Sequence, residues 1–173
     1  MEARVVLDGQ ELQVADVVAV ARHGAATELG PEALRRMAAA RAVVEDVLAR
    51  GEVVYGVNTG FGELSRVRIS DGDLAILQRN LIASHSAGIG EPLPREVVRG
   101  MLLLLAASLA RGNSGVRPLV AEQIVALLNH GVMPLVPAKG SVGASGDLAP
   151  LAHIGLVLIG EGEATLGDER LPG

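Results

Sequence analysis

A glycine-rich stretch, GSVGASGDLAPLAHIG at residues 140–155, contains the residues whose types and spacing could do chemistry. Ser145 stands between Ala144 and Gly146, just before an apolar segment that is typical of a helix. Such a serine has three chemical uses: it can act as a nucleophile, belong to a phosphate-binding loop, or take part in a reaction of the backbone itself.

The spacing argues against the first two uses. A hydrolase nucleophile elbow has the pattern G-x-S-x-G, whereas residues 143–147 read GASGD. A phosphate-binding loop has a lysine after its glycines, but Lys139 precedes them here. A generic anion site at the helix start is also disfavoured, because the carboxylate of Asp147 would repel an anion there. We expect Asp147 to cap the helix or to lie in its first turn.

The third use is a reaction of the backbone. Attack of the Gly146 amide nitrogen on the Ala144 carbonyl carbon would close a five-membered ring. Gly146 has an unhindered nitrogen and the freedom to form a tight turn. Loss of the Ser145 hydroxyl as water would leave an exocyclic methylene, which is an electrophile that no ordinary side chain provides. Because Ala-Ser-Gly also occurs in unreactive loops, an ordinary loop remains the alternative.

Two further stretches precede this one, YGVNTGFG at 55–62 and QRNLIASHSAG at 78–88. Together with GSVGASGDLAPLAH at 140–153, they resemble the motifs of the aromatic amino acid ammonia-lyases. The resemblance covers nearly the whole chain. It implies that Ala144, Ser145 and Gly146 become 4-methylidene-imidazol-5-one (MIO), the electrophilic prosthetic group of that family.

The resemblance also implies roles for the residues of the first stretch. Tyr55 is expected to be the catalytic base on a mobile loop, where as tyrosinate it would take the β-proton of the substrate. Gly60 and Gly62 are expected to allow the loop to move, and Asn58 to support it, as Asp147 supports the other loop. An ordinary buried tyrosine is the alternative for Tyr55.

The Ser84-His85 pair resembles the branch of the family that deaminates histidine. His85, together with Ser84, is expected to contact the substrate imidazole, and a helix-surface or core histidine is the alternative. The implied reaction is the non-oxidative deamination of L-histidine to trans-urocanate and ammonia. Alternatives are a lyase or aminomutase for phenylalanine or tyrosine in the same family, or an inert, self-associating fragment.

The implied fold is mainly α: the helical N-terminal, MIO-bearing domain of the ammonia-lyase fold, in the fumarase/aspartase-like superfamily, with small β-hairpins near both ends. Residues 1–173 are expected to form this single domain, without the central helix bundle and C-terminal part of the family. Family members are homotetramers with active sites shared between subunits. This chain alone is therefore expected to be inactive, because catalytic groups tolerate little displacement.

Local sequence patterns predict mostly helices. The expected helices cover 15–23, from Pro31 to Gly51, from Ser70 onward, 94–111, 118–130 and from about 147 onward. RVVLDGQELQV at 4–14 and ATLGDERLP at 164–172 are typical of hairpins. Three histidines are assigned structural roles: His23 and His130 in the last turns of helices, and His153 as a satisfied core histidine.

The expected helix at 94–111 contains MLLLLAASLA, which is apolar on nearly every side. Such a helix requires burial all round. Its five leucines cannot all face one small core, so we expect an apolar patch and self-association of the chain. These leucines are Leu102, Leu103, Leu104, Leu105 and Leu109.

Composition excludes several other classes of protein. A net charge of −5 gives no basic footprint for nucleic acid. The absence of cysteine excludes disulfides and thiolate metal sites. No two histidines have metal-like spacing with a carboxylate, so we expect no metal. The apolar runs are too short to span a bilayer, and the N-terminus lacks the pattern of a signal peptide. A soluble, cytoplasmic protein is expected.

Overall fold

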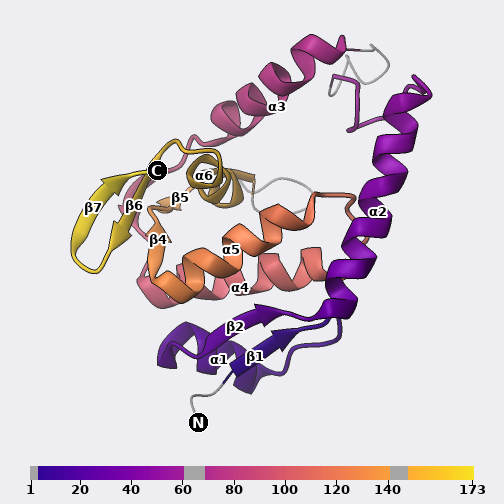
Figure 1. Cartoon of the computed structure of the whole chain (residues 1–173). Coiled ribbons are helices and arrows are strands. Elements are labelled where there is room, and N and C mark those ends of the chain that lie inside the picture. The colour runs from indigo at the N-terminus through magenta and orange to yellow at the C-terminus, as the bar shows by residue number, and fades with distance from the viewer. Residues whose placement is uncertain (1–3, 61–68, 141–147) are drawn as a thin grey trace.

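The structure is a computed structural model that describes residues 4–60, 69–140 and 148–173, and this part of the chain is mainly helical (Figure 1). The expected mainly α fold is confirmed. The helices are α1 (Val14–His23), α2 (Pro31–Ala49), α3 (Asp71–His85), α4 (Arg95–Ala110), α5 (Pro118–His130) and α6 (Leu148–Leu158).

The short strands of the described residues form three small sheets. β1 and β2 pair in parallel, β3 and β5 pair antiparallel, and β4, β6 and β7 form an antiparallel sheet in the order β4-β6-β7. The strands are β1 (Arg4–Leu7), β2 (Ala26–Leu29), β3 (Ile89–Pro92), β4 (Val132–Pro134), β5 (Pro137–Lys139), β6 (Glu163–Leu166) and β7 (Glu169–Pro172).

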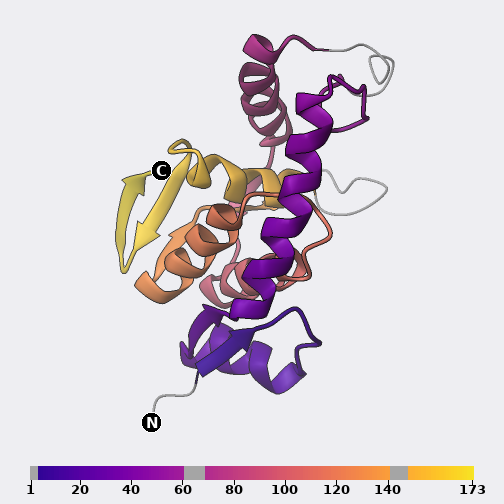
Figure 2. The same ribbon diagram turned by 45° about the vertical axis from the view of Figure 1, so that its right-hand side comes forward.

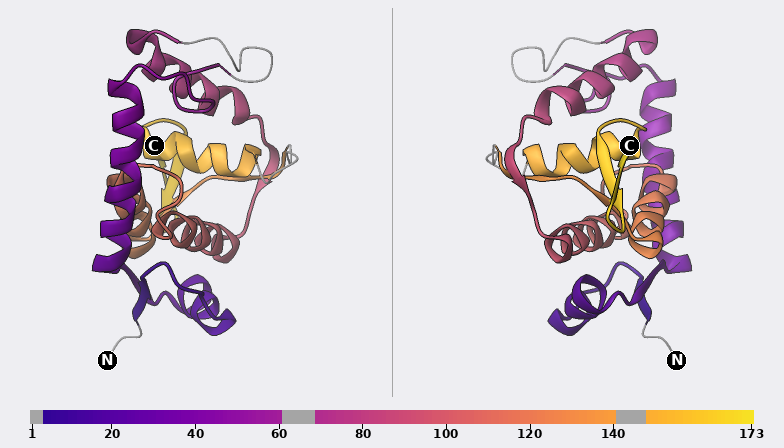
Figure 3. Two further views of the ribbon diagram at one scale, coloured as in Figure 1. Left: turned by 90° about the vertical axis from the view of Figure 1, so that its right-hand side faces the viewer. Right: turned by 90° about the vertical axis from the view of Figure 1, so that its left-hand side faces the viewer.

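Helices α4 and α5 form the centre of the molecule. Leu102, Leu103 and Ile124 are completely buried between them and their neighbours. The unit of β1, α1 and β2 covers one side of this pair, and α6 lies on the other side, between α5 and α3 (Figures 1 and 3). The long helix α2 runs along the flank of all these layers (Figure 2). The core is aliphatic, as a sequence with one tyrosine, one phenylalanine and no tryptophan requires.

A buried arginine joins two helix ends to this core. Arg99 on α4 donates from Nε to the carbonyl oxygen of Val20 at 2.9 Å and from Nη1 to that of Leu128 at 3.0 Å. These carbonyls belong to the last turns of α1 and α5, where the helix dipole is negative. Desolvation by burial and the nearby charge of Arg95 lower the pKa of Arg99. The two helix ends therefore compensate a charge that is costly to bury alone.

Several expected helix boundaries are confirmed. Pro31 and Pro118 begin α2 and α5. Gly24 and Gly131 end α1 and α5 in the left-handed conformation, with φ of 68° and 70°. His23 and His130 lie in the last turns of these helices, as predicted. The closing hairpin is also confirmed as β6 and β7.

The predicted N-terminal hairpin is wrong. Residues 4–7 form β1, but its partner is β2 in parallel register, with Val5 opposite Thr27. Asp8 and Gly9 begin a connection to α1 instead, where the Asp8 side chain accepts a hydrogen bond from the Gln10 amide at 2.9 Å. An Asx turn and a hairpin turn use the same residue types, so the local pattern could not separate them.

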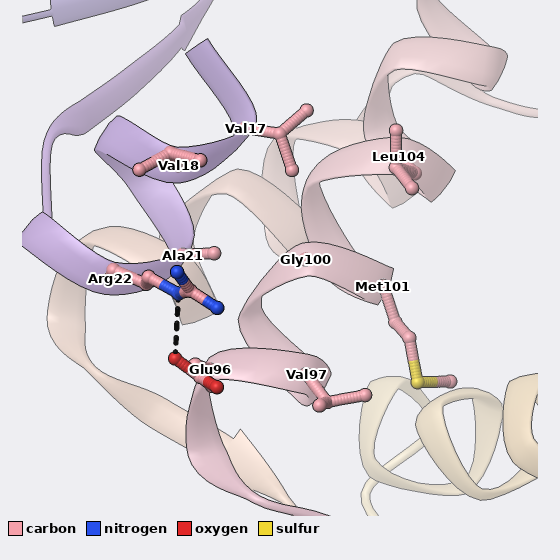
Figure 4. A pocket seen from close by; sticks show the side chains of 9 residues that line it. All are labelled: Val17, Val18, Ala21, Arg22, Glu96, Val97, Gly100, Met101 and Leu104. Atoms are coloured by element: carbon pink, nitrogen blue, oxygen red, sulfur yellow. Dashed lines mark hydrogen bonds and ion pairs between the residues drawn. The ribbon is translucent and has the colours of Figure 1, made fainter. Parts of the chain in front are cut away.

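The expectation that the leucine-rich helix would expose a large patch is also corrected. Leu102 and Leu103 are fully buried and Leu105 and Leu109 are half-buried, leaving only Leu104 of the five exposed, at 54%. Leu104 lies at the edge of a shallow apolar groove between α1 and α4 (Figure 4). At one end of the groove, Arg22 and Glu96 form an ion pair at 3.0 Å.

Candidate active site

The structure places both flanks of the Ala-Ser-Gly loop side by side. Gly140 enters the loop and Leu148 begins the helix that leaves it. A Cβ atom added to Gly140 would lie only 2.7 Å from the Cβ of Ala149, so the two flanks are in contact. Ala144, Ser145, Gly146 and Asp147 themselves lie outside the described residues, as does Gly62.

The end of α3 lies against the same flanks. The chain leaves α3 at His85 and enters β3, which pairs with β5 so that Ile89 is opposite Lys139. Gly88 is therefore beside Gly140: a Cβ added to Gly140 would lie 3.6 Å from the Cα of Gly88. The motif at 78–88 and the flanks of the motif at 140–153 thus meet in space.

His85 is the last residue of α3 and is half-buried. Its Nδ1 lies 2.7 Å from the carbonyl oxygen of Leu81, and the Ser84 Oγ lies 3.2 Å from the same nitrogen. Because a carbonyl oxygen can only accept, Nδ1 carries a proton in this arrangement. In the neutral ring Nε2 is then a hydrogen-bond acceptor.

The Tyr55 loop is organised around a buried amide. Asn58, which is 1% exposed, donates from Nδ2 to the carbonyl oxygen of Glu52 at 2.7 Å. Its Oδ1 accepts from the amide of Val54 at 2.9 Å. Thr59, also 1% exposed, donates from Oγ1 to the carbonyl oxygen of Gly60 at 2.9 Å. These bonds hold a turn from which the side chain of Tyr55 extends, 63% exposed.

The chain does not bring every expected site residue together. Gly56 and Val57, next to Tyr55, line a groove with the first half of α3, including Leu74 and Gln78. Gln78 is about 10 Å along the helix axis from His85, at roughly 1.5 Å per residue. The Tyr55 loop and His85 therefore lie towards opposite ends of α3, while His85 and the flanks of the Ala-Ser-Gly loop lie together.

One contact at the site was not expected from the sequence. His153 is hydrogen-bonded, as predicted, but it is half-buried and lies outside the buried core. Its partner is the backbone amide of Gly88, which donates to Nε2 at 3.1 Å. Desolvation by burial lowers the pKa of His153. Since the two residues lie far apart in sequence, no local pattern could have indicated this bond.

The described ranges lack two other features. Within residues 4–60, 69–140 and 148–173, no group of histidine and carboxylate side chains is arranged to hold a metal ion. In the same part of the chain, no helix has the length and apolar character that crossing a membrane requires.

Comparison with known proteins defines the class. Residues 12–173 match the family model of the aromatic amino acid lyases, and the chain belongs to this family. The family expected from the three motifs is thus confirmed. A histidine ammonia-lyase from Gloeobacter violaceus is 56% identical over 168 residues, which are 97% of this chain and 33% of that protein. The chain therefore spans about a third of the length of the curated relatives it matches.

Solved structures of the family have the same fold. Histidine ammonia-lyase from Trypanosoma cruzi has a TM-score of 0.88 and 40% identity, over 98% of this chain and 32% of that one. Tyrosine aminomutase from Streptomyces globisporus has a TM-score of 0.90 and 34% identity, over 98% and 32% of the two chains. The expected ammonia-lyase fold is therefore confirmed, and it is shared by members whose names give different substrates and reactions.

Proposed function

We propose that this chain is the N-terminal, MIO-bearing part of an enzyme that deaminates L-histidine to trans-urocanate and ammonia. The observation that carries the proposal is the meeting of the His85 end of α3 with both flanks of the Ala144-Ser145-Gly146 loop. Histidine ammonia-lyases whose sequences are 56% and 51% identical over 97% and 98% of this chain support histidine as the substrate. A cytoplasmic location is part of the same proposal.

The residues present fit the MIO group. Its three precursor residues lie in a segment whose base is closed by the contact of Gly140 with Ala149. A closed base favours the compressed turn that brings the Gly146 nitrogen to the Ala144 carbonyl carbon. Ring closure releases one water and dehydration of Ser145 releases a second. Once formed, the ring supplies an electrophile that assists the departure of the amino group.

Side chains of this chain contribute to the remaining chemistry. Tyr55, as tyrosinate, accepts the β-proton, the Cα–N bond breaks, and the new double bond forms between Cα and Cβ. His85 accepts a hydrogen bond from the substrate imidazole at Nε2, because its Nδ1 is held by the Leu81 carbonyl. Ser84, which is expected to contact the substrate imidazole together with His85, donates to the same carbonyl at 3.0 Å. Asn58, Gly60 and Gly62 are assigned to the support and movement of the Tyr55 loop, and Asp147 to the support of the Ala-Ser-Gly loop, as the family resemblance implies.

We further propose that the active enzyme is a homotetramer and that residues 1–173 form one domain of its subunit. The separation of the Tyr55 loop from His85 along α3 supports a site shared between subunits, because one chain alone leaves these groups apart. On this view residues 1–173 alone are folded, catalytically inactive and self-associating. Static light scattering and a histidine deamination assay on this segment test that view, and an active monomer would contradict it.

The second candidate is a lyase or aminomutase acting on phenylalanine or tyrosine. It is favoured by the close structural match to tyrosine aminomutase, at a TM-score of 0.90. The complete enzyme should be assayed with L-histidine, L-phenylalanine and L-tyrosine, with both the α,β-unsaturated acids and the β-amino acids measured as products. Urocanate from histidine alone supports the first proposal. Turnover of L-phenylalanine or L-tyrosine, to either the unsaturated acid or the β-amino acid, supports the second.

A further inference from the structure

The side chain of His153 links the two motifs at the site. Gly88 follows α3 by three residues, and its backbone amide donates to Nε2 of His153, on the second turn of α6, at 3.1 Å. Nε2 is therefore the acceptor, and the proton of the neutral ring is on Nδ1. A Cβ added to Gly88 would lie 2.9 Å from this Nε2 and 3.2 Å from the Cβ of Pro137, so the position is closely packed.

The bond belongs to a continuous contact between α3 and α6. One turn before His153, Ala149 packs against Gly140. Two residues after it, a Cβ at Gly155 would lie 3.3 Å from Cγ2 of Ile82 on α3. Helix α6 thus touches the strand that leads into the Ala-Ser-Gly loop and the helix that ends at His85. Figures 1 and 3 show α6 directly beside α3.

The short connection from His85 to Gly88 is itself held by local bonds. The Ala87 amide donates to the carbonyl oxygen of His85 at 2.8 Å, and Ser86 Oγ donates to that of Ile82 at 2.8 Å. A displacement of Gly88 is therefore transmitted to His85. Within the described part of the chain, the hydrogen bond from Gly88 to His153 is the one that ties residues 86–88 to another element.

We propose that His153 is a positioning residue: it fixes His85 relative to the helix that leaves the Ala144-Ser145-Gly146 loop. This role rests on the proposed histidine deamination and deepens it. A histidine suits the position because a rigid ring holds its acceptor nitrogen at a fixed distance from the helix. Burial disfavours the protonated ring and lowers its pKa, so Nε2 remains an acceptor near neutral pH.

The test uses four variants of the complete enzyme. His153→Phe keeps the ring volume and removes the acceptor, whereas His153→Gln keeps an acceptor at similar reach. Gly88→Ala disturbs the same contact from the other side, where the new Cβ would meet Nε2. His130→Phe is the matched control, because His130 is an exposed histidine in the last turn of α5.

Three measurements are made on each variant. Intact mass reports ring formation as the loss of two waters. Hydrogen exchange of peptides covering residues 86–92 reports protection of the Gly88 amide. Steady-state kinetics are measured with and without His85→Leu in the same chain, because a residue that acts through His85 loses its effect once the His85 ring is absent.

For His153→Phe we expect complete ring formation and faster hydrogen exchange at the Gly88 amide. We also expect kcat/KM to fall by about 10- to 100-fold, because small displacements at a reacting centre slow the reaction strongly. Gly88→Ala is expected to behave in the same way. His153→Gln is expected to restore kcat/KM to within about threefold, and His130→Phe to match the wild type. In the His85→Leu background, His153→Phe is expected to cost less than about threefold.

Three results would overturn the proposal: unchanged exchange at Gly88 in His153→Phe, loss of ring formation in that variant, or an equal kinetic cost with and without the His85 ring. Each leaves the proposed function intact. Failure of the proposed function is recognised in the wild type instead. A wild-type enzyme that does not deaminate histidine overturns both that function and the role of His153.

Discussion

The side-chain amide of Asn129 bonds to both backbone groups of Thr27. Its Oδ1 accepts from the Thr27 amide at 2.9 Å, and its Nδ2 donates to the Thr27 carbonyl oxygen at 2.8 Å. The amide thus takes the place of a third strand beside β2 and joins the N-terminal unit to the end of α5. The Thr27 Oγ1, by contrast, is buried without a hydrogen-bond partner in the described structure.

Removing this amide should loosen β2 locally. Asn129→Ala leaves the two backbone groups of Thr27 unpaired in a residue that is only 2% exposed. We expect a local cost of about 1 to 2 kcal/mol, seen as roughly tenfold faster exchange in peptides covering β2. Gln123→Ala, an exposed change on the same helix, is the control and should change nothing. Thr27→Val removes the unpaired hydroxyl and should leave exchange equal or slower. Unchanged exchange in Asn129→Ala would show that the amide pair does not hold this edge.

Tyr55→Phe removes the hydroxyl that we assign as the base and keeps the ring. In the complete enzyme we expect kcat to fall by about 10²- to 10⁴-fold, the usual range for losing a general base, with a much smaller change in KM. Val53→Ala, an exposed change in the same loop, is the control. A Tyr55→Phe enzyme with near-normal kcat would exclude this tyrosine as the base.

His85→Leu tests the substrate. The leucine cannot accept a hydrogen bond from an imidazole. We therefore expect kcat/KM for histidine to fall by about 10- to 100-fold, the usual cost of leaving one polar group of the substrate without its hydrogen bond. The ratio of kcat/KM for histidine to that for phenylalanine should fall as well. His130→Leu is the control. If the ratio stays constant while activity falls, His85 affects the fold or the ring and does not select the substrate.

The contact of His153 with Gly88 should depend on pH. Because burial lowers the pKa of His153 below the ordinary 6.5, the folded state favours the neutral ring. Its stabilising effect is fully present above about pH 6.5 and is lost as pH falls through the folded-state pKa. Protection at Gly88, corrected for intrinsic exchange, should therefore decrease on acidification in the wild type.

The elements packed against α6 also carry other ionisable side chains, namely His85 on α3, His130 on α5 and the carboxylates of α3, α5 and β6. All of these are common to the wild type and His153→Gln. The difference between the two proteins therefore isolates His153, and equal pH profiles would show that its protonation does not affect the contact.

The elements that the sequence predicted well have local causes. Prolines at the starts of α2 and α5, and left-handed glycines at the ends of α1 and α5, act on the residues beside them. The N-terminal hairpin was predicted wrongly because β1 pairs with a strand that follows an entire helix. The pairing of β3 with β5 went unpredicted for the same reason, because a two-strand pairing across distant segments has no local signal.

The same difference between local and long-range causes applies to the candidate site. The three motifs predict the site residues, and the structure brings two of these motifs together at Gly88 and Gly140. The bonds of Asn58 to Glu52 and Val54 give a physical reason for an asparagine beside Tyr55. The partner of His153 and the distance of the Tyr55 loop from His85 depend on how helices pack, and this was not visible in the motifs.

The proposed function depends on the conversion of Ala144, Ser145 and Gly146 into the MIO ring. Intact mass spectrometry of the purified complete enzyme measures this directly, with Ser145→Ala as the matched control. We predict that the wild type is lighter than its sequence by two water molecules, and that Ser145→Ala, which has no hydroxyl to lose, does not form the exocyclic methylene and loses activity by orders of magnitude. A wild-type enzyme with the full mass of its sequence that still deaminates histidine would contradict the central claim.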